Sequence, residues 1–543
     1  MKSGFLGLTL PQIIGLILGV FGLFLPFLLP LGTLSIAGQI GLGIFFMAAI
    51  FWMFEPIPIY ATSMLVIFLQ ILFLSAQGPV FMETELPVSE PVELEEQQWQ
   101  IPAGALKEDQ TVLISVGPGE TESVPVEVVD RNGQHVIVQS RELSADQAVV
   151  SDPGHRLVNY EPNSYTDYIG TLANPIIILF LGGFMLAGAS VKYNLDKNLT
   201  RYLLGPFGTK PQFIVLGLML VTAILSAFMS NTATAAMMVT VILPIIGQLE
   251  PEDRFKFGLA LAIPISANVG GITTPIGTPP NAIVIAALSD YGIDISFTDW
   301  IIIAAPLVIV MLVFAWWLLL ALFPPSADRI KLDLKGKLNL SPKAIGLYLI
   351  FGATVLLWIT ENQHGIPSSM VAFLPVAALV TGRILNKNDI RELPWEVLWL
   401  MAGGISLGIG MDQTGLAVWM ISGFDWGAMG YITLTLTFAI VAIAMSNFLS
   451  NTVTATLLMP LVISLQTSGV MGEEFNLLIT GVVVAVACSL AMALPISTPP
   501  NAIAMSTGII RTKDMAKMGV VIGTVGVLII LAYAVFYWPL VTN

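Results

Sequence analysis

Two short stretches of the chain each occur twice. Ser-Asn-Thr-Ala-Thr-Ala at 230–235 recurs as Ser-Asn-Thr-Val-Thr-Ala at 450–455, and Thr-Pro-Pro-Asn-Ala-Ile at 278–283 recurs unchanged at 498–503. Both pairs are separated by the same 220 residues. Two six-residue matches in one register indicate an internal duplication, and such a repeat is the first guide to an architecture.

The composition identifies the class of protein. Of the 543 residues, 55% are hydrophobic and 11% are charged. A soluble domain has about 25% charged residues, so a soluble globular protein is excluded. The length accommodates roughly ten to twelve spans of ~20 residues joined by short loops. The sequence therefore predicts an all-α polytopic membrane protein.

Apolar runs predict about eleven transmembrane spans plus two re-entrant hairpins. The spans are expected at 11–31, 35–54, 57–77, 169–190, 257–288, 298–323, 342–360, 366–385, 395–411, 475–508 and 514–540. Two full spans would barely fit in 212–249, so a hairpin with the Ser-Asn-Thr motif at its tip is at least as good an interpretation. The stretch 426–465 is its counterpart in the second copy.

The same pattern divides the chain into five parts. We expect scaffold helices in 1–77, a β-rich insert in 78–168, a first repeat in 169–323, a linker in 324–341 and a second repeat in 342–543.

Lys and Arg predict the orientation in the membrane. Outside the insert they fall in clusters, and the loops near 290–299, 361–366, 412–425 and 466–474 contain none. The number of spans between successive clusters allows every cluster to lie in the cytoplasm. The N-terminus is then inside, and the C-terminus and the insert are outside. Five spans then separate the two Ser-Asn-Thr copies, so the second repeat is inverted. Inverted repeats are typical of secondary transporters with a site at the midplane.

Prolines and glycines break two of the predicted spans. The prolines and glycines of 257–288 cannot belong to one continuous helix, and the span 475–508 breaks at Pro495, Pro499 and Pro500. Non-helical backbone at membrane depth is tolerated only where it lines a cavity in the protein. Its free carbonyls, with hydroxyl and amide oxygens, suit a small hard cation such as Na⁺. The helix N-termini and Asn or Thr donors suit an anion.

No Lys, Arg or His is predicted at membrane depth in either repeat. An anionic substrate would therefore be held by neutral donors and helix dipoles, and a bound cation would supply the missing positive charge. Substrate binding would then depend on the cation, which is the physical basis of symport. The competing interpretation is that the duplicated polar residues serve only as interhelical hydrogen bonds.

The repeated motifs resemble those of the divalent anion:sodium symporter family, which includes sodium-coupled di- and tricarboxylate and sulfate transporters. The resemblance rests on both Ser-Asn-Thr copies, GTPPNA at 277–282, STPPNA at 497–502 and AGGISLG at 402–408. It covers nearly the whole chain except 78–168. It implies a homodimer in the lipid bilayer, with a scaffold and a transport domain that moves as an elevator in each protomer.

The resemblance also implies residue roles. One sodium site would use Ser226, Ser230, Asn231 and Gly277, and a second would use Ser446, Asn451 and Ser497. Substrate carboxylates would meet Asn231, Thr232, Thr278, Asn451, Thr452 and Thr498. Some members of the family exchange anions without sodium, so sodium-independent exchange stays open.

The insert differs in character from the rest of the chain. Residues 78–168 hold 17 of the 36 acidic residues and 4 of the 22 basic ones. Strands are expected at Thr111–Val116, Val124–Val129 and Gln134–Val138, with turns at 117–119 and 132–133, and Glu83–Glu96 is expected to be a solvated linker. The pattern resembles the membrane-proximal β-domain of periplasmic adaptor proteins, which fits the inner membrane of a diderm bacterium. A periplasmic partner and a capping role both remain open.

The predicted function is sodium-coupled uptake of a divalent anion, with a C4-dicarboxylate such as succinate as the leading substrate. Sulfate or another oxyanion is the alternative within the same class. A receptor or assembly factor that works through the insert is the alternative from another class. No phosphate-binding glycine loop, nucleophile elbow or HExxH motif occurs, so neither an enzyme nor a nucleic-acid partner is expected.

Overall fold

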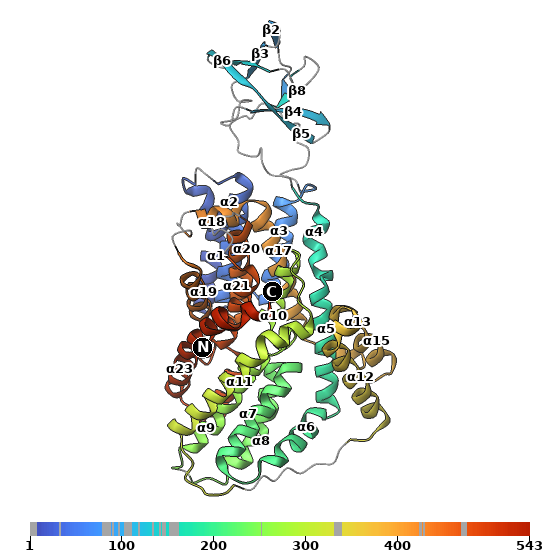
Figure 1. The fold of residues 1–543 in the computed structure, drawn as a ribbon, viewed down its shortest axis with the longest axis vertical. Helices are drawn as coiled ribbons and strands as arrows, with labels where there is room; N and C mark the ends of the chain where they lie inside the picture. The colour runs from blue at the N-terminus through green and yellow to red at the C-terminus, as the bar shows by residue number, and fades with distance from the viewer. Residues whose placement is uncertain are drawn as a thin grey trace.

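The protein is a helical body with a small β domain, as the computed structural model shows (Figure 1). The structure describes residues 8–31, 34–78, 88–89, 92–95, 98–102, 111–117, 120–132, 135–140, 143, 148–150, 162–250, 252–330, 339–422, 426, 429–467 and 475–542.

The helices follow the order of the predicted parts. Before the β domain come α1 (Leu10–Leu28), α2 (Ile36–Phe54) and α3 (Ile59–Leu74). After the β domain come α4 (Tyr165–Gly170), a 3₁₀ turn η3 (Thr171–Ala173), α5 (Pro175–Lys192), α6 (Leu195–Leu204), a 3₁₀ turn η4 (Gly205–Phe207), α7 (Pro211–Phe228), α8 (Asn231–Ile246), α9 (Phe255–Gly271), α10 (Pro279–Ser289) and α11 (Phe297–Leu322).

The remaining helices are α12 (Pro342–Ile359), α13 (Glu361–His364), α14 (Ser368–Val371), α15 (Phe373–Thr381), α16 (Lys387–Arg391), α17 (Trp395–Gln413), α18 (Leu416–Ser422), α19 (Tyr431–Ser446), α20 (Asn451–Thr467), α21 (Leu477–Leu490), α22 (Pro499–Ser506), α23 (Thr512–Phe536) and α24 (Trp538–Val541).

Local chemistry fixes many helix starts. Proline is the first residue of α5, α7, α10, α12 and α22. This position suits proline because the first backbone N–H of a helix has no intrahelical partner. At α5 the preceding Asn174 also accepts a hydrogen bond from the Ile176 N–H at 3.0 Å. The predicted span 366–385 contains the consecutive helices α14 and α15, which continue through Ala372, and the assignment is interrupted there because Pro375 has no backbone N–H to donate to the Val371 carbonyl.

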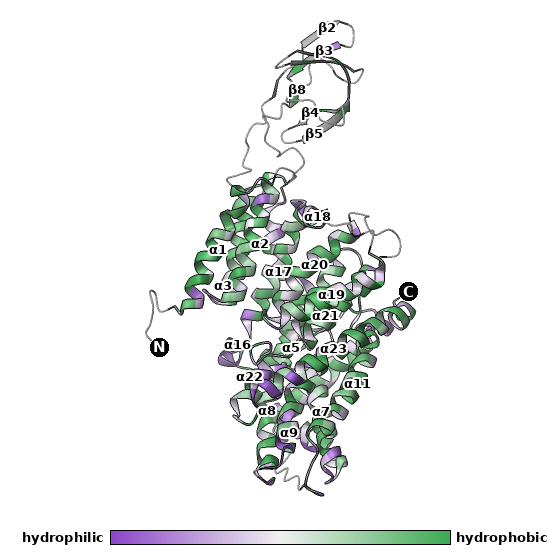
Figure 2. Cartoon of the chain, turned by 90° about the vertical axis from the view of Figure 1, so that its left-hand side faces the viewer, coloured by the Kyte–Doolittle hydropathy of each residue, from purple (hydrophilic) through white to green (hydrophobic). Residues whose placement is uncertain are grey.

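The duplication extends from the motifs to whole helices. Helices α5, α7, α8 and α10 each begin 220 residues before α17, α19, α20 and α22. The hairpin α7–α8 and α9 lie in the half of the body away from the β domain, and α19–α20 and α21 lie in the nearer half (Figures 1 and 2). Helix α10 packs against α20 and α21, and α22 packs against α8 and α9. The helix after each break therefore packs against the other repeat.

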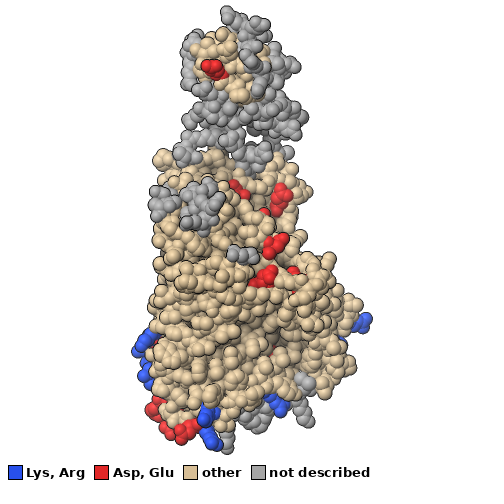
Figure 3. Space-filling view, viewed as in Figure 1, with Lys and Arg blue, Asp and Glu red and all other residues tan. Residues whose placement is uncertain are grey.

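The helical body has the surface of a membrane protein. Eight helices of the described residues are long and apolar enough to cross a membrane, and seven more apolar helices are shorter. Large apolar side chains such as Phe24, Trp317 and Phe536 are exposed, and apolar residues run along the helices in Figure 2. The number of crossings stays a prediction. On the face drawn in Figure 3, the Lys and Arg side chains gather in the half away from the β domain.

Two cores stabilise the helical body. The larger core includes α5, α7–α11 and α19–α23, and the smaller one joins α1–α3 to α17 and α18. A buried pair on α3 and α17 ties these helices together: Gln70 Nε2 donates to the Ser406 carbonyl at 2.8 Å, and the Ser406 hydroxyl donates to Gln70 Oε1 at 2.5 Å. Gly410 makes room for this pair, since a Cβ there would lie 2.1 Å from Gln70 Nε2.

The β domain consists of two four-stranded antiparallel sheets. Their strand orders are β1-β8-β4-β5 and β2-β3-β7-β6. The strands are β1 (Val88–Ser89), β2 (Val92–Glu95), β3 (Gln98–Pro102), β4 (Thr111–Gly117), β5 (Glu120–Pro125), β6 (Glu127–Asn132), β7 (His135–Gln139) and β8 (Ala148–Val150). Trp99, Ile101, Val112 and Val138 are among the buried residues between the sheets.

Two expectations for the insert were wrong. The expected strand Val124–Val129 is two strands, because the chain leaves one sheet after Pro125 and enters the other at Glu127. The acidic stretch expected to be a linker contains β1 and β2, and β2 pairs with β3 through Glu93 opposite the buried Trp99. Its glutamates alternate with apolar residues, so they do not prevent pairing. Residues 83–87, 90–91 and 96 of that stretch lie outside the described residues.

The chain leaves and re-enters the helical body at one place. The Ala76 N–H donates to the Asn163 carbonyl at 2.8 Å, and the Tyr165 N–H donates to Gln77 Oε1 at 2.9 Å. Helix α4 begins at Tyr165, and Tyr168 is 0% exposed in the core shared with α1–α3. The residues after 163 therefore belong with the helical body.

We expect the helical body to fold without the insert. Replacing 78–162 by about five Gly or Ser residues, with an r.m.s. reach of ~12 Å, keeps the hydrogen-bonded ends in place. A deletion extended to 168 removes Tyr168 and should lower the free energy of unfolding by about 3 kcal/mol, typical of emptying a buried aromatic site. Thermal unfolding of both variants in detergent tests this. Equal midpoints for the two deletions would contradict it.

Candidate functional site

Two side chains donate to the carbonyls of the first break, between α9 and α10: Asn281 to three of them, and Trp300 Nε1 to the Ile272 carbonyl at 3.0 Å. Asn281 Nδ2 donates to the carbonyls of Gly271 at 3.2 Å, Ile272 at 3.2 Å and Thr274 at 2.8 Å. These carbonyls lie where the helix stops, so they lack the usual partners four residues later. The break is also tightly folded, since a Cβ on Gly277 would lie 2.3 Å from the Gly271 carbonyl oxygen.

The tip of the first hairpin lies against this break. Ser226 Oγ lies 2.5 Å from Asn231 Oδ1 and 2.8 Å from the Ala267 carbonyl oxygen. Asn231 in turn contacts Gly271, where an added Cβ would lie 2.7 Å from Asn231 Oδ1. The hydroxyl of Thr274 donates to the Ala227 carbonyl and ties the break to α7. Oxygen atoms of the tip and the break thus meet around Asn231.

The second break repeats the arrangement. Asn501 Nδ2 donates to the carbonyls of Met492 and Leu494, both at 2.9 Å. Ser497 Oγ donates to the Asn447 carbonyl at 3.1 Å, and Asn447 Oδ1 accepts from the Ala493 N–H at 2.8 Å. These bonds attach the second break to the C-terminal end of α19.

The second hairpin tip holds two buried oxygen atoms without hydrogen-bond partners among the described residues. They are Ser446 Oγ, at the last residue of α19, and Asn451 Oδ1, at the first residue of α20. The thiol of Cys488 on α21 lies beside Ser446. Buried polar atoms are rarely left unpaired in native proteins, so such a pair of oxygens suits a bound cation.

A side chain of the first repeat reaches the second break. Asn268 on α9 donates through Nδ2 to Thr498 Oγ1 at 3.0 Å and lies 3.3 Å from Asn501 Oδ1. Thr498 Oγ1 also accepts from the Asn501 N–H at 3.4 Å. The two repeats are therefore joined by hydrogen bonds at the level of the motifs.

The structure brings together part of each predicted residue set. Ser226 and Asn231 are in contact and reach Gly277 through Gly271, while Ser497 is bonded to the residue after Ser446. Ser230 precedes α8, and Thr232 is exposed in its first turn. Thr278, Thr452 and Thr498 are buried. Their roles in binding sodium or substrate stay predictions.

The electrostatics of the site come from uncharged groups. The side chains that form hydrogen bonds at the two tips and breaks are uncharged, and the other polar atoms there are backbone carbonyl and N–H groups, with the thiol of Cys488 beside them. Helices α8, α10, α20 and α22 all begin at the repeated motifs, and helix N-termini carry partial positive charge. The arrangement can hold a small cation by oxygen atoms and an anion by N–H groups.

Comparison with known proteins identifies the family of this chain. The family described as "Sodium:sulfate symporter transmembrane region" matches residues 153–543. The chain belongs to the divalent anion:sodium symporter family. This membership makes the protein a transporter of the bacterial plasma membrane, and it confirms the resemblance drawn from the motifs.

Individual relatives in sequence are about one-third identical to this chain. It is 32% identical over 405 residues to a sodium-dependent dicarboxylate transporter, SdcS, of Staphylococcus saprophyticus, covering 67% of this chain and 77% of that one. It is 31% identical over 391 residues to an uncharacterized transporter of Haemophilus influenzae, covering 67% and 82%. The solved YdaH transporter of Alcanivorax borkumensis aligns with TM-score 0.49 and 12% identity, covering 74% and 93%.

Four asparagines of the candidate site were not among the site residues predicted from the sequence. Asn281 and Asn501 stand in the repeated motif, so the repeat itself was a signal for them. Asn447 precedes the second motif and carries no such signal. Asn268 was hidden because the residue 220 positions later is Cys488, and the match between repeats fails there.

Gly271→Ala should disrupt the first of the two predicted sodium sites. The new Cβ would lie 2.7 Å from Asn231 Oδ1 and 2.8 Å from Asn231 Nδ2, so Asn231 must move. We expect the apparent affinity for sodium to fall at least tenfold, as measured by the thermal stabilisation of the purified protein at increasing sodium concentrations. Gly352→Ala on α12 is the matched control, because no atom lies within 4 Å of its Cβ position. Equal sodium responses in both variants would place the site elsewhere.

Proposed function

We propose that this protein couples uptake of a divalent anion, with a C4-dicarboxylate such as succinate as the leading substrate, to entry of Na⁺. The proposal rests on uncharged oxygen atoms at the two hairpin tips. Ser226 Oγ lies 2.5 Å from Asn231 Oδ1 at the first tip, and at the second tip Ser446 Oγ and Asn451 Oδ1 are buried without hydrogen-bond partners among the described residues. The staphylococcal relative, named a sodium-dependent dicarboxylate transporter, supports it.

The coupling follows from the chemistry of the clusters. A dianion cannot be desolvated among neutral groups without a large cost in free energy. Sodium ions held by Asn231 and Asn451 would offset that cost, since each asparagine offers an oxygen to the ion and an amide N–H₂ to a carboxylate. The nearby Thr232, Thr278, Thr452 and Thr498 would add hydroxyl donors. Substrate would then bind tightly only after sodium.

Orientation and assembly belong to the same proposal. The basic side chains gathered away from the β domain in Figure 3 favour that end as cytoplasmic, with the N-terminus inside. The insert and the C-terminus would then be extracytoplasmic. Family membership favours a homodimer in which the hairpins and broken helices move as an elevator. For the insert, we favour a capping role over docking of a periplasmic partner, because its two ends meet at one place.

Reconstituted uptake tests the proposal. We expect labelled succinate to enter proteoliposomes at least tenfold faster with an inward sodium gradient than with a matched potassium gradient. Sulfate uptake under the same conditions tests the alternative substrate. Uptake of labelled succinate into succinate-loaded vesicles without sodium tests sodium-independent exchange. Absence of sodium stimulation for both anions would refute symport. The variant lacking 78–162 should retain uptake, and its loss in a folded variant would make the insert functional.

Asn231→Ala and Asn451→Ala should each abolish uptake while the protein still inserts and folds. Each change removes the amide that serves ion and carboxylate together. The matched control is Asn388→Ala, an exposed residue of α16 away from both tips. Uptake is measured with thermal unfolding of the same preparations, so that loss of fold is recognised. Normal uptake by Asn451→Ala would show that the second site lies elsewhere.

A further inference from the structure

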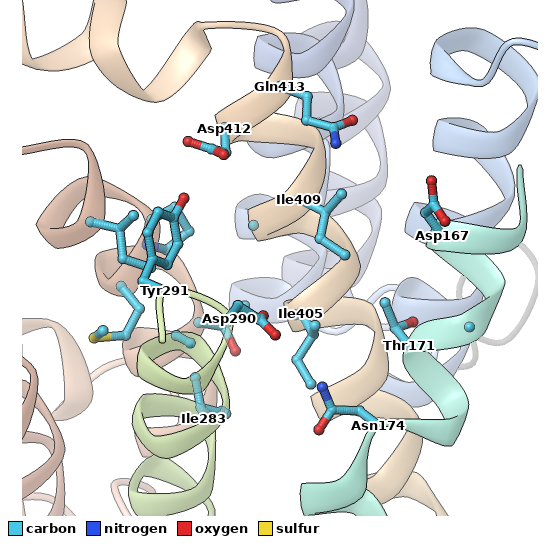
Figure 4. Close-up of a pocket in the computed structure, with 18 residues that line it drawn as sticks. Asp167, Thr171, Asn174, Ile283, Asp290, Tyr291, Ile405, Ile409, Asp412 and Gln413 are labelled. Carbon is cyan, nitrogen blue, oxygen red and sulfur yellow. The ribbon is translucent and has the colours of Figure 1, made fainter. Parts of the chain in front are cut away.

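A cavity of about 450 Å³ lies apart from the two breaks. It lies between α4, the start of α5 and α17 on one side and α10 and α20 on the other (Figure 4). Its walls are mostly apolar, and include Ile283 of α10, Ile405 and Ile409 of α17, and Met459 of α20. On α17, Gly404 and Gly408 line it where α20 approaches closely, since an added Cβ would lie 2.6 Å from Thr456 Oγ1 and 3.6 Å from Pro460 Cγ, respectively.

Three carboxylates from three elements line this cavity. They belong to Asp167 on α4, Asp290 directly after α10 and Asp412 on α17, and all three residues are exposed. None of the described residues that line the cavity is Lys, Arg or His. Tyr291 lies near Asp412 (Figure 4), and burial first and the Asp412 charge second raise the pKa of its phenol. The field at this cavity therefore attracts cations and repels a dianionic substrate.

Two polar atoms of the lining have no hydrogen-bond partner among the described residues. Thr456 on α20 is 1% exposed, and its Oγ1 is unpaired and lies toward Gly404, where a Cβ would come within 2.6 Å. Gln413 Oε1, at the end of α17, is also buried and unpaired. Both atoms can accept hydrogen bonds from a ligand in the cavity.

We propose that this cavity binds an amphipathic organic cation, an ammonium group attached to an apolar body. The apolar walls accommodate the hydrocarbon, the aspartates attract the charge, and the unpaired oxygens accept from ammonium N–H groups. The ring of Tyr291 adds a cation–π contact. An inorganic metal ion fits less well, because the described residues include no group of three His, Cys, Asp or Glu side chains that could hold one.

Such a ligand would affect the motif helices. Helices α10 and α20 begin at Pro279 and Asn451, within the repeated motifs, and their later turns form one wall of the cavity. The opposite wall, α4 and α17, carries neither motif. A ligand that contacts both walls binds one arrangement of these helices better than others, so it shifts their populations. Inhibition of uptake without competition against substrate follows, and this consequence alone rests on the proposed function.

Binding is tested on the purified full-length protein, without transport. The probes are 4-phenylbutylammonium, the uncharged 4-phenylbutanol and the anionic 4-phenylbutyrate, which share one apolar body, and affinity is measured by calorimetry. We expect the ammonium to bind at least tenfold more tightly than the alcohol, and no binding of the carboxylate. Equal binding of the ammonium and the alcohol would overturn the proposal, because the cavity would then be an apolar crevice for lipid or detergent.

Variants locate the site. Asp290→Asn and Asp412→Asn should each weaken ammonium binding about fivefold. Ala287→Leu, which fills the cavity from α10, should also weaken ammonium binding, because the larger side chain takes up space in the cavity. Asp294→Asn is the matched control, an exposed aspartate of the same loop that does not line the cavity. Unchanged affinity in both aspartate variants would overturn the assignment. So would displacement of the ammonium by saturating Na⁺, since that result would place it in a sodium site.

Discussion

The structure depends on how backbone groups are satisfied where two helices stop inside the membrane. A helix that ends there leaves carbonyls without partners, and lipid cannot supply any. Asn281 and Asn501 provide the donors, each from the first turn of the helix that follows its break. This is why a Thr-Pro-Pro-Asn motif occurs twice: proline starts the new helix, and asparagine closes the end of the old one.

The pseudo-symmetry of the two repeats is close but incomplete, and the difference is chemical. From the first repeat, Asn268 donates to Thr498 of the second repeat and lies next to Asn501 Oδ1. Its counterpart in the second repeat is Cys488, which has no amide to donate. Accordingly Asn281 Oδ1 is buried without a hydrogen-bond partner among the described residues. The two sites therefore have the same plan but different surroundings, so their ion affinities need not be equal.

Packing explains how helices from both repeats form one site. Helix α10 packs against α20 and α21, while α22 packs against α8 and α9. Each hairpin thus contacts a helix of the other repeat, and the motifs cannot move independently. By contrast α1–α3 have their own core with α17 and α18, joined through the Gln70–Ser406 pair. The β domain adds a third, separate core and connects to the helices at one junction.

The sequence alone determined the membrane class, the duplication, the breaks and the family, because hydrophobicity, helix-breaking residues and repeated motifs are local properties of the chain. Four pairs of corresponding helix starts in the two repeats lie 220 residues apart, as the motif spacing predicts. Only the tertiary structure showed that Asn268 crosses to the second break, that Asn231 contacts Gly271, and that Tyr168 belongs to the helical core. These contacts join residues far apart in the chain, and no spacing rule relates such residues. The division of Val124–Val129 between two sheets was hidden for the same reason, since strand partners are chosen by packing.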